Sequence, residues 1–199
     1  MAMPLTKYLS KSGSYDGFDI LPRAIKWCSN NITSRYPNFR FHFADIYNKH
    51  FNPNGRLTAA DFRFPYGDGM FDLVFLTSVF THMLQNDVEH YLSEISRVLK
   101  LDGRCLITWL LLNEESKQLI ERGNSSVALL HRVEGSLTVD KDVPEKAVAY
   151  EEADVLKFYA RQGLRLTRPI YYGSWCGRSE YLSYQDISIA YKSRADAPF

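Results

Sequence analysis

Two apolar runs separated by one helical pattern constrain the fold of this chain more than any other feature. Phe71–Ser78 is continuously apolar after Asp72, and Arg104–Leu112 is a second apolar run. Between them, apolar residues recur at helical spacing from Val88 to Leu99. Such runs are typical of strands buried on both faces of a parallel sheet, and two parallel strands need a crossover connection. We therefore predict a βαβ unit across this stretch.

The ends of the crossover helix are also marked in the sequence. Asn86 is a good N-cap residue, and Glu89 follows three positions later, as in a capping box. Asp102 and Gly103 form a turn signal just beyond the last apolar position. We expect the helix to begin at Asn86 and to end before this turn.

Strands and helices also alternate before this unit. Met1–Leu9 has helical spacing, and Tyr15–Ile20 and Asn38–Ile46 have the composition of short strands. Pro22 begins a helix between these strands, since proline is tolerated in the first helical turn. The first half of the chain is therefore expected to form parallel strands joined by helices.

A helix and two strands are predicted near the end of the chain. Tyr150–Gln162 has a helical apolar face, and Leu164–Tyr172 and Gln185–Tyr191 read as strands of an antiparallel hairpin with a long loop. Asn113–Val148 gives no regular pattern beyond a short strand near Leu137. The predicted fold class is α/β, with a mostly parallel, Rossmann-like sheet that ends in an antiparallel C-terminal hairpin.

Composition limits what such a fold can do. The 199 residues have a net charge of +1, and 45% are hydrophobic. These values suit one soluble domain, which we place at residues 1–192 with a tail at 193–199, and they give no basic field for nucleic acid. No apolar run is long enough to cross a membrane. Three dispersed cysteines are typical of a reducing compartment, so we expect a cytoplasmic protein.

Four short motifs occur in an order that is more informative than any one of them. They are GFDI at residues 17–20, FADI at 43–46, FPYGDGMFDLVFLTSVFTHM at 64–83 and RVLKLDGRCLIT at 97–108. Together they resemble the second-, third-, fourth- and fifth-strand regions of the class I S-adenosylmethionine-dependent methyltransferases. The resemblance covers most of the chain. It implies S-adenosyl-L-methionine as cofactor and a small-molecule acceptor.

One part of the family pattern is absent from the sequence. No G-x-G-x-x-G, nor a loose version of it, occurs here. The resemblance would place the family's first strand and its glycine-rich loop before Met1, so we expect an N-terminally truncated methyltransferase sheet. In that family the first strand lies between the second and the fourth. Its loss would leave two inner strands without a ladder partner, which favours self-association through strand pairing.

The resemblance assigns cofactor-binding roles to Asp19 and Ile20, at the carboxyl end of the predicted second strand of the family sheet. A carboxylate there can accept hydrogen bonds from both ribose hydroxyls, and the isoleucine can pack on the adenine. The alternatives are that Asp19 caps the helix that starts near Pro22, and that Ile20 is a core residue.

A second acidic position in the resemblance has two candidates. Asp45 ends the predicted third strand and could accept the adenine amino group. The link from Tyr47 to Phe64 is longer than usual, however, so Asp61 could take that part. A surface turn is the alternative for both residues.

Thr77, Ser78 and Phe80 lie at the carboxyl end of the apolar strand, where the resemblance places the cofactor's sulfonium. His82 follows and is the predicted catalytic residue, a general base, although a structural histidine is an equal alternative. His82 and His90 are eight positions apart and no cysteine or carboxylate completes a metal-ligand set with them, so we expect no metal site.

Four aromatic residues near the end hairpin have two interpretations. These residues are Tyr171, Tyr172, Trp175 and Tyr181. They either line an acceptor pocket or cover the edge of the sheet. The predicted function is methyl transfer from S-adenosyl-L-methionine to a small molecule, impaired if the glycine loop is needed. The alternatives are an inactive methyltransferase-like fragment or partner-binding module, and a nicotinamide-dependent oxidoreductase, against which the FDLVFLTSVFTHM and RVLKLDG motifs argue.

Overall fold

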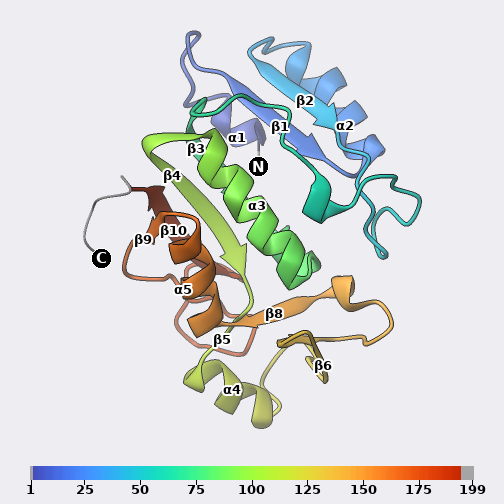
Figure 1. Ribbon diagram of the computed structural model, residues 1–199, viewed down its shortest axis with the longest axis vertical. Coiled ribbons are helices and arrows are strands. Elements are labelled where there is room, and N and C mark those ends of the chain that lie inside the picture. The colour runs from blue at the N-terminus through green and yellow to red at the C-terminus, as the bar shows by residue number, and fades with distance from the viewer. Residues whose placement is uncertain (1, 194–199) are drawn as a thin grey trace. The chain divides into compact units, whose positions relative to one another are not determined.

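The computed structural model describes residues 2–193 (Figure 1). The chain divides into two compact units, Met1–Thr58 and Ala59–Phe199, where the sequence predicts one domain. Of the predicted tail, only Ser193 lies within the described residues.

The first unit is a small βαβ arrangement. Its elements are α1 (Ala2–Leu5), β1 (Tyr15–Asp19), α2 (Pro22–Cys28), the π-helical turn η1 (Ser29–Thr33) and β2 (Phe39–Phe43). β1 and β2 are parallel, with Tyr15 opposite Phe39 and Asp19 opposite Phe43. Pro22 stands in the first turn of α2, as predicted, where its missing N–H leaves no bond unmade.

Apolar packing and one ion pair hold the first unit together. Ile32 and Phe39 are fully buried, and the Tyr15 and Phe39 rings stack with their centroids 5.4 Å apart. Asp16 on β1 accepts two hydrogen bonds from Arg40 on β2. These bonds hold the pKa of the Asp16 carboxyl below its ordinary value.

The second unit contains the predicted central βαβ unit and the C-terminal hairpin. Its main elements are β3 (Phe71–Leu76), α3 (Gln85–Val98), β4 (Leu99–Trp109), α5 (Glu152–Arg161), β9 (Leu164–Leu166) and β10 (Asp186–Lys192). These strands form a sheet in the order β3-β4-β10-β9. β3 is parallel to β4, and β10 is antiparallel to both β4 and β9. The α/β class and the antiparallel end of the sheet are therefore confirmed.

A second, smaller sheet is built from the stretch that gave no regular pattern. Its strands, in the order β5-β8-β7-β6, are accompanied by a helix and a short 3-10 turn. The elements are β5 (Leu111–Leu112), α4 (Glu114–Glu121), β6 (His131–Val133), β7 (Ser136–Thr138), η4 (Pro144–Lys146) and β8 (Val148–Glu151). β7 is the short strand expected near Leu137, and β5 falls within the strand predicted at Arg104–Leu112; α4, β6 and β8 were not predicted.

The core of the second unit lies on one face of the larger sheet. Alternate residues of β4, Cys105, Ile107 and Trp109, are fully buried there. The Trp109 ring contacts Tyr159 of α5, with centroids 6.0 Å apart, and α3 and α5 lie along this face (Figure 1). The opposite face is more open, and Leu73 on β3 is 53% exposed.

The crossover helix starts one residue earlier than predicted, and the signal taken as its stop lies inside the following strand. α3 begins at Gln85, one residue before Asn86, and its N-cap residue makes no side-chain capping bond. At the other end β4 starts directly at Leu99, and Asp102 adopts a left-handed φ of 61° within this strand. The Asp-Gly signal therefore marks an irregularity in the strand pairing instead of a helix end. A Cβ at Gly103 would lie 2.8 Å from the Lys100 carbonyl, so the close chain approach requires glycine there.

Two shorter 3-10 turns, η2 (Ala59–Asp61) and η3 (Phe80–His82), complete the second unit. Within residues 2–193, no helix has both the length and the apolar character to cross a membrane.

Candidate active site

The carboxyl ends of β3 and β4 define one edge of the larger sheet. Thr77 and Ser78 follow β3, and Thr108 is the penultimate residue of β4. β10 runs antiparallel to β4, so Gln185, directly before its first residue, lies at the same edge. Ligands of open α/β sheets bind outside the carboxyl ends of the strands, and this edge is therefore the candidate site of the second unit.

Hydrogen bonds join three of these side chains. The Ser78 N–H donates to Thr108 Oγ1 at 2.9 Å, and Thr108 Oγ1 donates to Gln185 Oε1 at 2.6 Å. Ser78 Oγ donates to the same Gln185 oxygen at 3.0 Å. Gln185 Nε2 lies 3.5 Å from the hydroxyl of the buried Thr81. The cluster is thus polar and uncharged.

Ser78 adopts an unusual backbone conformation, with φ of 53°. A non-glycine residue in this left-handed region costs on the order of 1–3 kcal/mol and persists where surrounding bonds hold it. Here its N–H and Oγ are both bound within the cluster. Thr77, which precedes it, is partly buried at the same edge.

Phe80 occupies a different environment from the one predicted. Its side chain has 0% exposure, and its ring packs against Trp109 and Tyr91 at centroid distances of 4.9 and 6.3 Å. A ring enclosed on all sides is not available to a cofactor. Phe80 is therefore a core residue that anchors the start of η3 against Trp109 and Tyr91.

His82, on η3, makes a hydrogen bond that fixes which ring nitrogen carries the proton. Its Nδ1 lies 2.9 Å from the carbonyl oxygen of Glu145 on η4. A carbonyl oxygen only accepts, so Nδ1 is the donor, and the neutral ring has its lone pair on Nε2. This is the tautomer that a base acting through Nε2 requires. Among residues 2–193, no three histidine, cysteine or carboxylate side chains lie together in a way that could hold a metal ion.

The four aromatic residues near the end hairpin separate into buried and exposed members. Trp175 is fully buried, and Tyr172 is partly buried with its hydroxyl donating to Glu152 at 2.9 Å. Tyr171 is 41% exposed and forms a β-bridge with Ile187 next to the candidate site, and Tyr181 is also exposed. Trp175 and Tyr172 therefore contribute to the interior, and Tyr171 is the exposed member whose backbone pairs with Ile187, two residues from Gln185.

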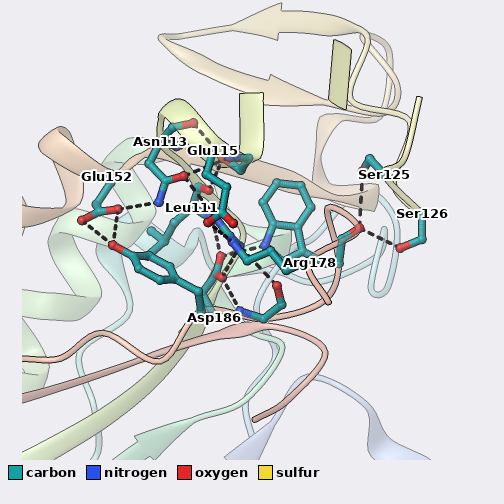
Figure 2. Close-up of polar contacts among 12 residues, drawn as sticks. Leu111, Asn113, Glu115, Ser125, Ser126, Glu152, Arg178 and Asp186 are labelled. Atoms are coloured by element: carbon teal, nitrogen blue, oxygen red, sulfur yellow. Dashed lines mark hydrogen bonds and ion pairs between the residues drawn. The ribbon is translucent and has the colours of Figure 1, made fainter. Parts of the chain in front are cut away.

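A buried carboxylate anchors the loop between β9 and β10 (Figure 2). Asp186 has 0% exposure and accepts hydrogen bonds from the N–H groups of Leu111 and Gly173 and from Trp175 Nε1, each at 2.7 Å. Arg178, whose side chain is 4% exposed, adds an ion pair at 3.2 Å. Burial raises the pKa of the Asp186 carboxyl, against the opposing effect of these donors.

Arg178 extends the same network to the smaller sheet. Its Nε donates to Glu115 at 2.7 Å and its Nη2 to the Asn113 side chain at 3.1 Å (Figure 2). Asn113 caps α4 through a reciprocal capping box with Ser116. Burial acts to lower the pKa of Arg178, but Glu115 and Asp186 outweigh it and raise the pKa. The network therefore ties the β9–β10 loop to the start of α4.

In the first unit, Asp19 ends β1 and is exposed, and Ile20 beside it is partly buried. Asp19 Oδ1 accepts a hydrogen bond from the N–H of Leu21, the N-cap residue of α2, at 2.9 Å. This is a local turn bond, and α2 has no side-chain capping bond, so the structure does not give Asp19 the capping role named as the alternative. The bond uses one carboxylate oxygen and leaves Oδ2 able to accept from a ligand hydroxyl. The turn bond and ribose binding are therefore compatible.

The two candidates for the adenine position differ in their surroundings. Asp45 follows β2 in the first unit, and its carboxylate forms an ion pair with Arg56. Asp61 is an exposed residue of η2 in the second unit. A carboxylate held by Arg56 is less available to an adenine amino group, so the ion pair weakens the prediction for Asp45.

Sequence reasoning missed Thr108, Gln185 and Asp186. Thr108 looked like an ordinary residue of an apolar strand, and its partner Gln185 is 77 positions away. The one local signal was the adjacent polar pair Gln185-Asp186 at the start of a predicted strand. Successive residues of an extended chain point to opposite faces, so Gln185 joins the cluster around Thr108 and Asp186 joins the buried network around Trp175.

Comparison with known proteins now identifies the class to which this fold and edge belong. The family described as methyltransferase domain matches residues 3–107, more than half of the chain. The chain therefore belongs to the S-adenosylmethionine-dependent methyltransferases, enzymes that take their methyl group from that cofactor.

Solved structures agree on the fold. A methyltransferase from Methanosarcina mazei has a TM-score of 0.60 at 17% identity, over 94% of this chain and 86% of that chain. A Pyrococcus horikoshii protein gives 0.61 at 15% identity, over 97% and 76%. The 1,6-didemethyltoxoflavin-N1-methyltransferase of Burkholderia thailandensis, whose structure contains that compound and S-adenosylhomocysteine, gives 0.51 at 10% identity, over 97% and 76%. At these identities the similarity is one of fold.

The residues of the chain fit parts of S-adenosyl-L-methionine unequally. An exposed carboxylate with a remaining acceptor, Asp19, suits ribose hydroxyls, and Ile20 offers an apolar surface beside it. The neutral hydroxyl and amide cluster around Ser78 suits a polar ligand without net negative charge. For the methionine part, the sequence contains no glycine-rich loop of the G-x-G-x-x-G kind.

Proposed function

We propose that this chain methylates a small-molecule acceptor with His82 as general base. The observation that supports this role is the hydrogen bond from His82 Nδ1 to the Glu145 carbonyl, which leaves the lone pair on Nε2. S-adenosyl-L-methionine supplies an electrophilic methyl group on a sulfonium that leaves readily. His82 then takes the proton that the acceptor's hydroxyl or amine loses as it is methylated.

The other residues at this edge orient the reactants. In this proposal, Thr77 and Ser78 line the side of the site at which the methyl group is presented. Phe80, the first residue of η3, packs against Trp109 and anchors this turn on the core. Displacement at a sulfonium depends mainly on proximity and alignment, so a rigid edge with one base is sufficient.

For the cofactor, we propose that Asp19 Oδ2 accepts from the ribose hydroxyls and that Ile20 packs against the adenine. Asp45 would contribute only if its ion pair with Arg56 rearranges, and Asp61 is the alternative acceptor for the adenine amino group. The exposed position of Asp19 at the end of β1 supports its assignment.

Asp19→Asn tests this assignment without removing the bond to Leu21. The asparagine Oδ1 can still accept from the Leu21 N–H, but the second carboxylate oxygen and its charge are lost. A hydrogen bond to a charged group contributes about 1.5–3 kcal/mol, so S-adenosylhomocysteine should bind about 10- to 100-fold more weakly, with unchanged thermal stability. Asp16→Asn is a control that loses the Arg40 pair instead. Equal affinities of wild type and Asp19→Asn would leave Asp19 with the turn bond alone.

The absent glycine-rich motif favours a second candidate function, that of a non-enzymatic partner-binding module. The two functions differ in their ligand. The enzyme binds S-adenosylhomocysteine and releases it on turnover, whereas the module does neither.

We also propose that the chain associates with itself through β3, the strand at the edge of its sheet. Exposed apolar edge strands are templates for pairing with another chain, and Leu73 stands on this strand. Sedimentation velocity should show a concentration-dependent dimer that Leu73→Lys converts to monomer, because lysine on an edge opposes pairing. Monomer at all concentrations for wild type would refute this proposal.

The cysteines bear on where the protein works. Cys28, Cys105 and Cys176 are free thiols in the structure. Free thiols support a reducing compartment, and we therefore propose the cytoplasm.

A further inference from the structure

We propose that Gln185 selects the acceptor. In this assignment Gln185 Nε2 donates a hydrogen bond to a carbonyl oxygen of a neutral, ring-bearing molecule that also carries the hydroxyl methylated at His82. The inference rests on the proposed function, and it adds the class of acceptor and the residue that recognises it.

The hydrogen-bond cluster fixes how the Gln185 amide is oriented. Thr108 Oγ1 accepts from the Ser78 N–H, so its own proton must go to another acceptor. The nearest partner is the Gln185 amide at 2.6 Å, and Ser78 Oγ reaches the same atom at 3.0 Å. Both contacts are satisfied when this atom is Oε1, and Nε2 then points away from them.

The remaining donor capacity of Gln185 is only weakly used. Its Nε2 has two N–H groups, and the one contact that the structure gives it is Thr81 Oγ1 at 3.5 Å, the outer limit of a hydrogen bond. Gln185 is also partly exposed at the edge of the sheet. An oriented amide donor with an accessible N–H can recognise a ligand oxygen. Sites built around such a donor discriminate strongly against analogues that lack the oxygen.

The side chains of Gln185 and Asp186 point to opposite faces of the sheet, so Gln185 is not part of the buried network around Asp186. Asp186 faces the interior, whereas Gln185 and Ile187 share the opposite face. Tyr171 pairs directly with Ile187, with mutual backbone bonds of 3.0 and 2.8 Å. Residues diagonal to such a pair lie about 7–8 Å apart, within reach of long side chains. The exposed Tyr171 ring is therefore a surface on which a planar acceptor can pack beside Gln185.

The charge of the cluster limits the chemistry of the acceptor. Its members, Ser78, Thr81, Thr108 and Gln185, are all neutral. Phosphate or carboxylate recognition normally uses arginine or lysine, so a carbonyl is the better match. His82 follows Thr81 in η3, so the proposed base is the sequence neighbour of the residue that Gln185 Nε2 approaches. A hydroxyaryl ketone combines a ring, a carbonyl and an ionisable hydroxyl.

Gln185→Glu isolates the proposed donor. A glutamate keeps an oxygen that accepts from Thr108 and Ser78 but replaces the Nε2 donor by a second acceptor. The probes are the three isomers of hydroxyacetophenone, and ethylphenols of the same substitution serve as analogues without the carbonyl. Each is titrated into the full chain saturated with S-adenosylhomocysteine. Gln118→Glu, on the exposed surface of α4, is the control for the added charge.

Wild type and Gln118→Glu should bind at least one hydroxyacetophenone about tenfold or more tightly than the matching ethylphenol. Gln185→Glu should lose this preference for the ketone and keep the thermal stability of the wild type. Equal binding of ketone and ethylphenol by the wild type, including failure to bind any ketone, would overturn the assignment. So would a preference that survives in Gln185→Glu. Failure of the proposed function appears separately, as a wild-type chain that does not bind S-adenosylhomocysteine.

Discussion

Replacing Asp186 by alanine should lower the free energy of unfolding by about 3–5 kcal/mol, the usual cost of removing one partner from a buried ion pair. The change leaves the Arg178 guanidinium, which is almost fully enclosed, without its buried counter-charge. It also leaves three N–H donors that now point at Asp186 without an acceptor. Small domains are stable by only about 5–15 kcal/mol, so this single change removes a large part of the total.

Chemical denaturation of the variant gives the direct measurement. Asp154→Ala is the matched control, because Asp154 pairs with Lys157 on the exposed surface of α5 and should cost less than about 1 kcal/mol. Combining Asp186→Leu with Arg178→Met removes both charges. The pair should recover only part of the loss, since the N–H donors of Leu111 and Gly173 stay buried. A loss below about 1 kcal/mol for Asp186→Ala would contradict this account of the network.

The second large effect is expected at His82. Asparagine is the informative replacement, because its Nδ2 can donate to the Glu145 carbonyl as His82 Nδ1 does, while it has no base at the position of Nε2. We expect turnover with a hydroxyacetophenone to fall by about 10²- to 10⁴-fold, the usual contribution of a general base. Binding of S-adenosylhomocysteine and thermal stability should stay at the wild-type level.

The split between kcat and KM separates this role from a structural one. His82→Asn should lower kcat and leave the KM for the acceptor close to that of the wild type. His90→Gln is the control, since His90 bonds the Phe62 carbonyl through Nε2 and a glutamine amide can replace that bond. Turnover of His82→Asn within threefold of wild type would leave His82 with the structural role alone.

The sheet was predictable where the pattern was long and local. β3 and the apolar part of β4 are continuous runs, and the buried face of α3 has clear helical spacing. The Asp102-Gly103 signal was misread, because left-handed residues occur both after helices and at irregularities of a strand. The pairing of β3 with β4 shows that the second case applies here, because its register shifts at this point.

The smaller sheet was not predictable in the same way. Its strands have two to four residues each, too short for a recognisable period. α4 begins with a capping box made by Asn113 and Ser116, in which serine takes the place of the usual glutamate or glutamine. β6 and β7 form a local hairpin, whereas β5 and β8 are defined only by pairing between distant parts of the chain, with Leu111 opposite Tyr150.

The candidate site also contains residues that a local pattern predicts and residues that depend on strand pairing. Ser78 and His82 were proposed because they follow a strongly patterned strand, and Ser78 lies just beyond the carboxyl end of β3. Phe80 has the same sequence position relative to that strand, yet its ring is enclosed by Trp109 and Tyr91. Gln185 enters the site only because β10 pairs antiparallel with β4. An aromatic residue at a strand end can face either way, and sequence spacing does not decide it.

The central claim, that the chain is a cofactor-using methyltransferase, is tested most directly by titration calorimetry with S-adenosylhomocysteine. The wild-type chain, shown to be folded by a cooperative thermal transition, should bind one equivalent and release the methyl group of S-adenosyl-L-methionine to a hydroxyacetophenone. A folded chain that gives no binding heat and no displacement of a fluorescent adenosine analogue would contradict the claim.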